Sequence, residues 1–343
     1  MTRFTAHSLK RTREVPRVSK INMNSSVTQD FKSRIFIITG AILLLFAVLI
    51  TISNGLLLFV IYKDPLKTFR NPTAVVVISL GVADFLTGCL TAVDVGISHI
   101  LEGLDIQKVL LQAKIISQIT VRGSVYTLTM FAVERFIAVA FPYTYRVSIT
   151  VRKTAIGCAV CWGLAIVTSC LELAVDRDLY DIIFFYVTFV LPLATMCFTY
   201  CATYYLIKIK AGRVYRQRGN SENKHRERGS TRREKMSKQS AELQKQLMKT
   251  ASLIIIVFAL SLVPFWSFTA IRQYCKECAE KKWFLAGYRF SIPILYSNSA
   301  LNPLLYAWRM RPYRRSFQTL FGKKQNCDRR RRRELTPSNV SSV

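Results

Sequence analysis

Long uncharged apolar segments alternate along this chain with short segments rich in lysine and arginine. Four segments carry no charged residue, namely residues 35–62, 182–207, 250–271 and 290–308. A helix that crosses the hydrocarbon core of a bilayer needs about 20 apolar residues, far more than a buried strand uses. The pattern therefore predicts membrane-spanning helices, and it explains how a chain that is 51% hydrophobic also carries a net charge of +29.

Three further segments are apolar but contain or adjoin charged residues. They span residues 71–100, 115–139 and 154–171. All the segments together predict an all-α membrane protein, a seven-transmembrane helix bundle that occupies residues 35–309. A short amphipathic eighth helix is expected on the membrane surface at residues 310–321.

The segments outside the predicted bundle differ in their charge. Residues 1–34 are expected to form a disordered arm without a cleavable signal peptide, about residues 209–242 the third loop, and residues 322–343 a disordered basic tail. Cytoplasmic loops carry an excess of Lys and Arg. Because the loop and tail are more basic than the arm, we expect a plasma-membrane protein with its N-terminus outside. The basic segments flank the spans, so anionic lipid rather than nucleic acid is the expected contact.

Four residues outside the spans are candidates for covalent modification. Cys275 and Cys278 form a CxxC pair in a short outer loop, where an oxidising compartment favours a disulfide. Asn24 begins a glycosylation sequon, whose alternative interpretation is an unused sequon. Cys327 follows the last helix and is either palmitoylated or a solvent-exposed thiol.

Asp84 lies in the middle of a predicted span, where an ionisable residue is costly and indicates function. Oxygen and amide groups on three other spans can converge on it, and this donor set suits a hard monovalent cation such as Na⁺. The alternative is a hydrogen-bonded network around a protonated Asp84. The residues of this sodium or polar network are Asn54, Asp84, Ser124, Asn298, Ser299 and Asn302. No other cofactor is expected.

Arg122 lies thirteen residues before Arg135 (135 − 122 = 13), which is about 20 Å along a helix and towards the outer half of the bundle. A charged group at that depth cannot face lipid cheaply. One interpretation is an ion pair with Asp94 or Glu172. The other is that Arg122 binds an anionic part of a ligand.

Every predicted span carries a landmark, and the landmarks keep a fixed order and spacing. They are Asn54-Gly55, Leu80-Gly81-Val82-Ala83-Asp84, Glu134-Arg135-Phe136, Trp162, Pro192 with Tyr200, Phe258 with Pro264, and Asn302-Pro303-Leu304-Leu305-Tyr306. Over about residues 35–321 this set resembles the rhodopsin-like G-protein-coupled receptors. The resemblance implies a switch for a heterotrimeric G protein, formed by Glu134, Arg135, Tyr200, Tyr306 and Pro142.

The resemblance also implies a way to hold the switch at rest. Glu134 holds Arg135, and many relatives add an acid on helix six, where this chain has Gln244 with Glu242 nearby. We therefore predict raised basal signalling.

Within the family, the end of the chain resembles adenosine receptors, through residues 306–311, residues 297–299 and the CxxC pair. The chain departs from that pattern at several positions. Leu262 replaces a Trp, Leu110 stands where most members have a cysteine, and the following outer loop is very short, as in melanocortin receptors. The pocket implied by the resemblance consists of Ser117, Gln118, Val121, Arg122, Phe265, Trp266, Thr269, Ile292 and Tyr296.

These patterns predict a receptor that converts binding of an extracellular ligand into activation of a G protein. The ligand expected from the adenosine-like end is a small polar molecule. The alternatives are a peptide- or lipid-activated receptor of melanocortin-like type, and a receptor-like protein with constitutive or lost signalling. Arrestin and receptor kinases are further expected partners. An enzyme is not expected, because the sequence suggests no nucleophile, base and orienting group that would act together.

Overall fold

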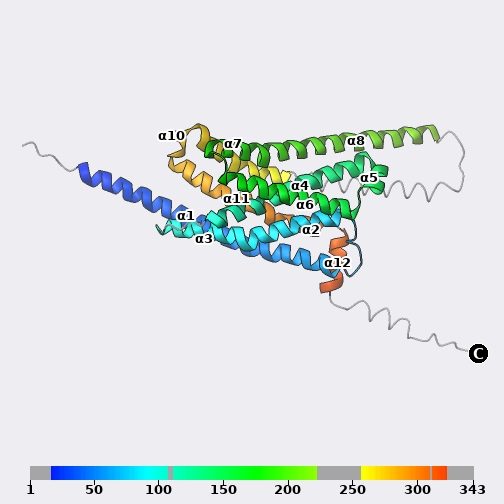
Figure 1. Cartoon of the computed structure of the whole chain (residues 1–343), viewed down its shortest axis with the longest axis horizontal. Coiled ribbons are helices and arrows are strands. Elements are labelled where there is room, and N and C mark those ends of the chain that lie inside the picture. The colour runs from blue at the N-terminus through cyan, green and yellow to red at the C-terminus, as the bar shows by residue number, and fades with distance from the viewer. Residues whose placement is uncertain (1–16, 107–110, 222–255, 310, 323–343) are drawn as a thin grey trace, which may run out of the picture.

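The computed structural model describes residues 17–106, 111–221, 256–309 and 311–322. All regular elements in these ranges are helices, and the long ones lie side by side in an elongated bundle (Figure 1). The long helices are α1 (Arg17–Lys63), α2 (Pro72–Leu86), α3 (Val93–Gly103), α4 (Leu111–Ala140), α6 (Val151–Cys170), α8 (Leu191–Ser221), the Ile256–Tyr274 helix and α11 (Lys282–Arg309).

Shorter helices connect or extend the long ones. They are the π-helices η1 (Thr87–Ala92) and η3 (Tyr186–Val190), the 3₁₀-helix η2 (Leu171–Leu173), α5 (Pro142–Ser148), α7 (Arg177–Phe185), α10 (Lys276–Ala279) and α12 (Arg311–Phe321). The second span is thus built from α2, η1 and α3, and the fifth from α7, η3 and α8. The range of α12 agrees with the predicted eighth helix.

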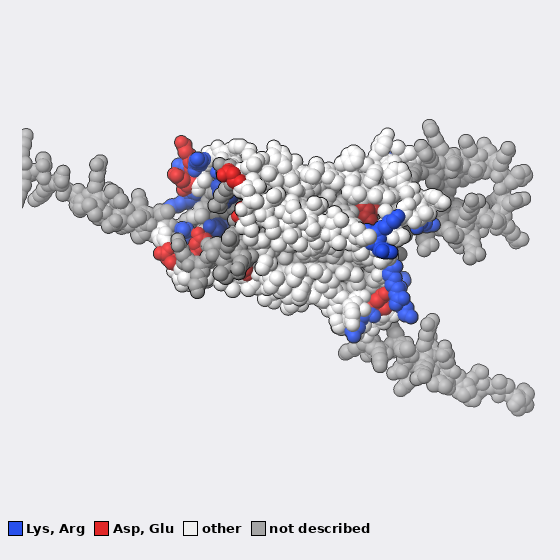
Figure 2. Space-filling model, viewed as in Figure 1, with Lys and Arg blue, Asp and Glu red and all other residues white. Residues whose placement is uncertain are grey.

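Six helical segments within the described ranges are long and apolar enough to cross a membrane. The seventh span is α11, which contains Lys282, Arg289 and two prolines and is therefore less apolar. It packs against α1, where the side-chain amide of Asn54 donates to the carbonyl of Ser299 at 3.1 Å. Charged side chains gather at the two ends of the bundle and leave an uncharged belt between them (Figure 2), as a bilayer requires. The predicted seven-helix membrane fold is confirmed.

Local capping explains where two of the spans begin. The Asn71 side chain accepts from the Ala74 amide ahead of α2, and Pro72 occupies the first turn, where its missing N–H costs nothing. Thr150 accepts from the Lys153 amide ahead of α6 in the same way. The cap ahead of α2 places Thr73 beside Glu134, near the C-terminal end of α4.

Two predicted boundaries differ from the structure. The expected disordered arm is helical from Arg17 onwards, because no glycine or proline interrupts the chain between Arg17 and Thr39. The third loop was expected from about residue 209, but α8 continues to Ser221. The rest of that loop and the tail from residue 323 lie outside the described residues.

The π-helix η3 lies directly before Pro192, the second residue of α8. Proline has no N–H and its ring clashes with the carbonyl four residues earlier, so a local widening of the helix accommodates it. The sequence indicates the proline but not the type of distortion. As a result, Phe189 faces the core next to the Ile256–Tyr274 helix, where it stacks on Trp266 with ring centroids 5.5 Å apart.

Candidate functional site

Near the C-terminal end of α4, Arg135 forms an ion pair with its neighbour Glu134. The Nε of Arg135 donates to Oε2 of Glu134 at 2.7 Å, and its Nη2 donates to Oε1 of the same carboxylate and to the Thr73 hydroxyl. Thr73 in turn donates to Glu134 at 3.1 Å. The guanidinium also lies over the Phe131 ring, 5.3 Å from its centroid. The arginine is thus held on α4 and tied to α2.

Tyr145 of α5 donates a further hydrogen bond to the Glu134 carboxylate. Burial raises the pKa of Tyr145, so its phenol remains protonated and a donor at neutral pH. Pro142 is exposed and begins α5, the short helix that places Tyr145. Sequence reasoning missed Thr73 and Tyr145. The position of Thr73 could have been inferred from Asn71, which caps the helix that Thr73 belongs to. For Tyr145 the sequence offered no comparable indication.

Among the described side chains, none of the remaining members of the predicted switch hydrogen-bonds to Arg135. Tyr200 is half-buried on α8 and is not among the hydrogen-bonding partners given above. Tyr306 belongs to α11, but its side chain lies outside the described residues, as do Gln244 and Glu242. The arrangement is therefore one in which Arg135 is held by α4, α2 and α5.

Asp84 lies wholly buried where three helices meet. Its carboxylate accepts from Ser124 at 2.9 Å, from Ser299 at 2.8 Å and from the Asn302 amide at 2.8 Å. Asn54 joins indirectly, through the carbonyl of Ser299. Four of the five predicted partners therefore connect to Asp84, although they are far apart in the sequence.

A small cavity of about 20 Å³ adjoins this network, and Ser124, Asn298 and Ser299 line it. That volume is enough for a water molecule or a small cation. The amide oxygens of Asn54 and Asn302 are buried without a hydrogen-bond partner in the described residues. A carboxylate, hydroxyls and unsatisfied amide oxygens are the ligands that a hard cation prefers. The residues present fit Na⁺.

Arg122 is the largest fully buried side chain in the described residues, at 1% exposure. Its Nη1 donates to Ser169 at 2.6 Å and its Nη2 donates to the Tyr180 hydroxyl at 2.5 Å, while its Nε has no partner. The guanidinium lies over the Phe184 ring, 4.4 Å from the centroid. Within the described side chains, the hydrogen-bonding partners of this cation are therefore neutral groups.

A chain of hydrogen bonds connects Arg122 to a carboxylate nearer the outer surface. The Tyr180 hydroxyl donates to Gln118 at 2.7 Å, and the Gln118 amide donates to Glu172 at 2.6 Å. The predicted contact between Arg122 and Glu172 is thus indirect, through two neutral side chains. Every bond in the chain runs in the same direction, from the cation to the carboxylate.

An aromatic cluster surrounds Trp266 below the outer ends of the helices. Its ring contacts are Phe184, Phe185, Phe189 and Phe265, with centroids 4.9–5.5 Å from the indole. Phe184 also contacts Arg122, so this cluster connects the buried cation to the Ile256–Tyr274 helix. Leu262, which stands where the resemblance has a Trp, lines the small cavity instead.

The other predicted pocket residues divide between the two halves of the bundle. Val121 and Tyr296 line the cavity next to Asp84, and Ile292 packs with Tyr296. Thr269 donates to the Phe265 carbonyl of its own helix at 2.9 Å. Ser117 is half-buried on α4, one residue before Gln118.

A further polar cluster, between α1, α3 and α11, was missed by sequence reasoning. Arg289 of α11 contacts His99 of α3 at 3.1 Å and Glu102 at 3.5 Å. His99 also contacts the Thr39 hydroxyl of α1 at 3.1 Å. A charged residue within a span, Arg289, was the available signal.

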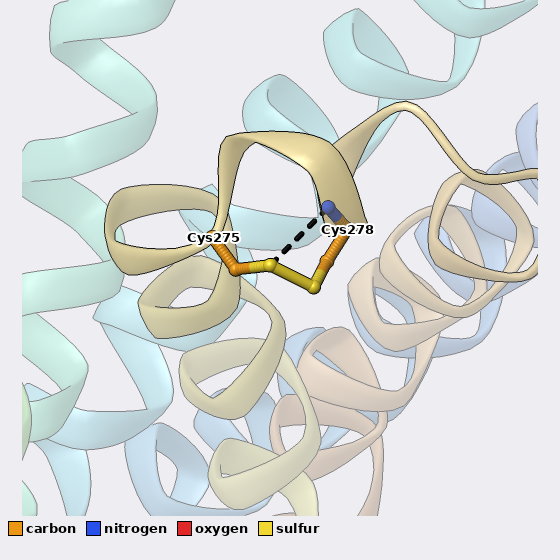
Figure 3. Close-up of a disulfide and its surroundings, with 2 residues drawn as sticks. All are labelled: Cys275 and Cys278. Carbon is orange, nitrogen blue, oxygen red and sulfur yellow. Dashed lines mark hydrogen bonds between the residues drawn. A yellow bond between two sulfur atoms is a disulfide. The ribbon is translucent and has the colours of Figure 1, made fainter.

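A disulfide joins Cys275 and Cys278 in the loop before α11, with Cα atoms 5.3 Å apart (Figure 3). The Cys278 amide also donates to Cys275 Sγ at 3.2 Å, which caps the short helix α10. Asn24 belongs to α1, but its side chain is not among those described, and Cys327 lies outside the described residues.

Comparison with known proteins identifies the family. The family model described as "7 transmembrane receptor (rhodopsin family)" matches residues 53–178 and 168–306. Human neuropeptide FF receptor 1 is 24% identical over 310 residues, which cover 83% of this chain and 70% of the relative. The thyrotropin-releasing hormone receptor of Gallus gallus is 23% identical over 340 residues, covering 89% and 82%. The chain belongs to the rhodopsin family of seven-transmembrane receptors.

Proposed function

We propose that this receptor is activated by an extracellular peptide and passes the signal to a heterotrimeric G protein. Family membership makes the chain a multi-pass membrane receptor with G-protein coupling, and not an enzyme. The observation that carries the ligand class is the pair of relatives named for neuropeptide FF and for thyrotropin-releasing hormone. They favour the peptide alternative over the small polar, adenosine-like ligand that the end of the sequence suggested.

The packing of the outer half supports a ligand that enters from the open end of the bundle. Trp266 and Tyr296 are large and buried. Only a short connection separates η2 from α7, which begins at Arg177. Such a loop covers little of the entrance, so a peptide end has access to the side chains below it.

We infer that Arg122 recognises an anionic group of that peptide. A buried charge is costly unless a partner of opposite charge compensates it, and here the direct partners are two hydroxyls and an aromatic ring. A carboxylate that displaced Tyr180 would supply the missing charge. Phe184 and Trp266 then provide a packed route from Arg122 to the Ile256–Tyr274 helix.

The proposed switch acts at the opposite end. At rest, Glu134, Thr73 and Tyr145 hold Arg135. Activation moves the Ile256–Tyr274 helix outward about Pro264, and Arg135 turns towards Tyr200 and Tyr306. The opened cleft receives the C-terminal helix of a Gα subunit, with α5 contributing to the contact. Arrestin and receptor kinases are proposed as later partners at the same surface.

Two further assignments complete the proposal. Na⁺ beside Asp84 would supply a positive charge within reach of Ser124 and Ser299, and the resting arrangement would bind it. The N-terminus is placed outside the plasma membrane, with Asn24 glycosylated on that side and Cys327 palmitoylated on the other. Basic loops and tail on the inside support this orientation.

A ligand panel tests the proposal directly. Cells that express the full chain with a promiscuous Gα subunit are exposed to matched sets of peptides, purines, amines and lipids. We expect a response within the peptide set, and loss of that response in R135A at equal surface expression. A response confined to purines would restore the adenosine-like interpretation and contradict the peptide assignment.

A further inference from the structure

A buried histidine joins three helices at the outer end of the bundle. His99 of α3 lies with Nδ1 at 3.1 Å from the Thr39 hydroxyl of α1 and with Nε2 at 3.1 Å from Nη1 of Arg289 of α11. The ring is 4% exposed. None of these contacts takes part in the ligand or G-protein sites proposed above.

The chemistry of the two contacts determines where the proton lies on the ring. Arginine only donates, so Nε2 of His99 must accept and carries no hydrogen. The proton then lies on Nδ1 and is donated to Thr39, whose own hydroxyl donates to the Ile35 carbonyl at 2.8 Å. The arrangement therefore requires a neutral imidazole. A second proton would remove the acceptor and leave two cations in contact.

The charges around His99 do not compensate a second proton. Lys32 of α1 lies 3.9 Å from Glu102, and Arg289 lies 3.5 Å from the same carboxylate. Glu102 thus serves two cations already, and it is the most exposed of the group. Tyr288 of α11 lies beside Arg289 as a neutral ring.

Among the described residues, one more cation lies near this group. Arg272 of the Ile256–Tyr274 helix contacts Tyr288, and its charge acts on that of Arg289. The π-helix η1 contains no charged residue, and Asp94 of α3 lies five residues from His99, about 7 Å along the helix. A protonated His99 would therefore add a further cation to a group in which Glu102 is already shared.

The packing indicates which helix would respond to that charge. A Cβ atom added to Gly40 of α1 would lie 2.8 Å from the Gly96 carbonyl oxygen of α3, so these backbones are in direct contact. Near Arg289, α11 is held to this pair through polar contacts and the Phe36 ring, whereas further along the helix it packs against α1 through apolar side chains. The same helix carries Ser299 and Asn302, the direct partners of Asp84.

We propose that His99 is a proton-binding site through which acid at the outer end of the receptor releases Arg289 and raises signalling. Protonation weakens the contact of α11 with α1 and α3 at Arg289, and α11 transmits the movement to the Asp84 network. The signalling part of this proposal depends on the proposed orientation and G-protein coupling, whereas the proton site depends only on the structure.

The first test measures the proton site without any ligand or G protein. An imidazole exposed to water titrates near pH 6.5. Acidification from about pH 7.8 to about pH 6.0 therefore shifts the equilibrium about fourfold from the state with a buried, neutral His99 towards states in which its imidazole is exposed to water. The purified full chain should therefore unfold at a temperature about 1–2 °C lower at the acid pH. H99Q keeps one acceptor and one donor but has no titrating group. The decrease in unfolding temperature between the two pH values should therefore be about 1–2 °C smaller in H99Q than in the unsubstituted chain.

The chain offers matched controls, because it contains three histidines. H7Q and H225Q remove the other two and should keep the decrease of the unsubstituted chain. A decrease in H99Q equal to that of the unsubstituted chain would overturn the proposal and assign the pH dependence to another group, such as Asp84.

The second test measures signalling in cells that express the full chain. Without peptide, second-messenger output should rise about fourfold between the same two pH values, and H99Q should abolish the rise. R289Q removes the repelling cation and should also abolish it, at equal surface expression. Output that does not change with pH overturns the proposal even if peptides activate the receptor. A response to acid without any response to peptides contradicts the peptide assignment instead.

Discussion

α4 carries two arginines, the fully buried Arg122 and the partly buried Arg135, whose partners differ. Arg135, near the C-terminal end of α4, bonds directly to the carboxylate of Glu134. Arg122 in the outer half donates to the hydroxyls of Ser169 and Tyr180, and its nearest carboxylate along the hydrogen-bond chain is Glu172, two side chains away.

The difference gives the two arginines different roles. The Glu134–Arg135 ion pair acts as a latch, meaning a contact that stabilises the resting state, whereas Arg122 is a group that can bind a ligand. A cation paired with a buried carboxylate is satisfied, so energy is needed to move it. A cation whose partners among the described side chains are neutral can gain energy by binding an incoming anion. We therefore expect the ion pair between Glu134 and Arg135 to stabilise the resting state, and Arg122 to bind an anionic group of the ligand.

The substitution with the largest effect is expected to be R122Q. R122Q should keep surface expression but raise the peptide concentration for half-maximal response about 30-fold or more, because loss of one partner of a buried charge pair costs several kcal/mol. Dose–response curves at matched expression measure this. S169A, which removes one hydroxyl contact, is the control and should cost much less. Loss of surface expression in R122Q would indicate a structural role instead.

E134Q tests the ion pair between Glu134 and Arg135. The substitution neutralises the carboxylate that holds Arg135, and a charge-assisted hydrogen bond is worth about 1.5–3 kcal/mol. Basal second-messenger output should therefore rise about tenfold. E280Q changes an exposed acid at the outer end and should leave basal output unchanged. Equal basal output in the two variants would contradict the latch.

The Asp84 network lies between the two arginines, so a test of its ion site shows whether the two ends are coupled. Replacing Na⁺ in the medium by choline should increase peptide affinity about fivefold, since the resting state would lose its stabilising ion. D84N should abolish this dependence on Na⁺. Radioligand or fluorescent-peptide binding measures both. A Na⁺ effect that persists in D84N would move the ion to another site.

The latch also predicts a basal signal in the unsubstituted receptor. Gln244 stands where many relatives carry a second acid, so the resting state lacks one charge pair worth about 1 kcal/mol. Basal output should be several-fold above that of cells without the receptor. Q244E should lower it. No difference from cells without the receptor would remove this part of the argument and favour a receptor that has lost signalling.

The smallest effect concerns a single hydrogen bond of the latch. Y145F removes the phenol that donates to Glu134 and should raise basal output about threefold, because a typical hydrogen bond contributes about 1 kcal/mol or less. Y143F changes an exposed tyrosine on the same short helix and is the matched control. A similar rise in both variants would mean that α5 acts on the G protein and not on Glu134.

Residue spacing predicted the polar network better than the pocket. Ser124, Ser299 and Asn302 reach Asp84 as expected, because each occupies a depth that the length of its own span determines. Thr73, Tyr145, His99 and Arg289 were missed as partners. A hydrogen bond between helices depends on their rotation and tilt, and the hydropathy of a segment does not report either one.

Hydropathy and residue spacing were enough to predict the number of spans, the family landmarks and an expected depth for Arg122, Arg135 and Asp84. Apolar length and residue spacing along one helix are local properties, and a bilayer converts them into depth. The contacts of Arg122 with hydroxyls, of Arg135 with a carboxylate and of His99 with Arg289 could be read only from the folded chain. Their chain positions differ by 190 residues, so the contact exists only through packing between helices.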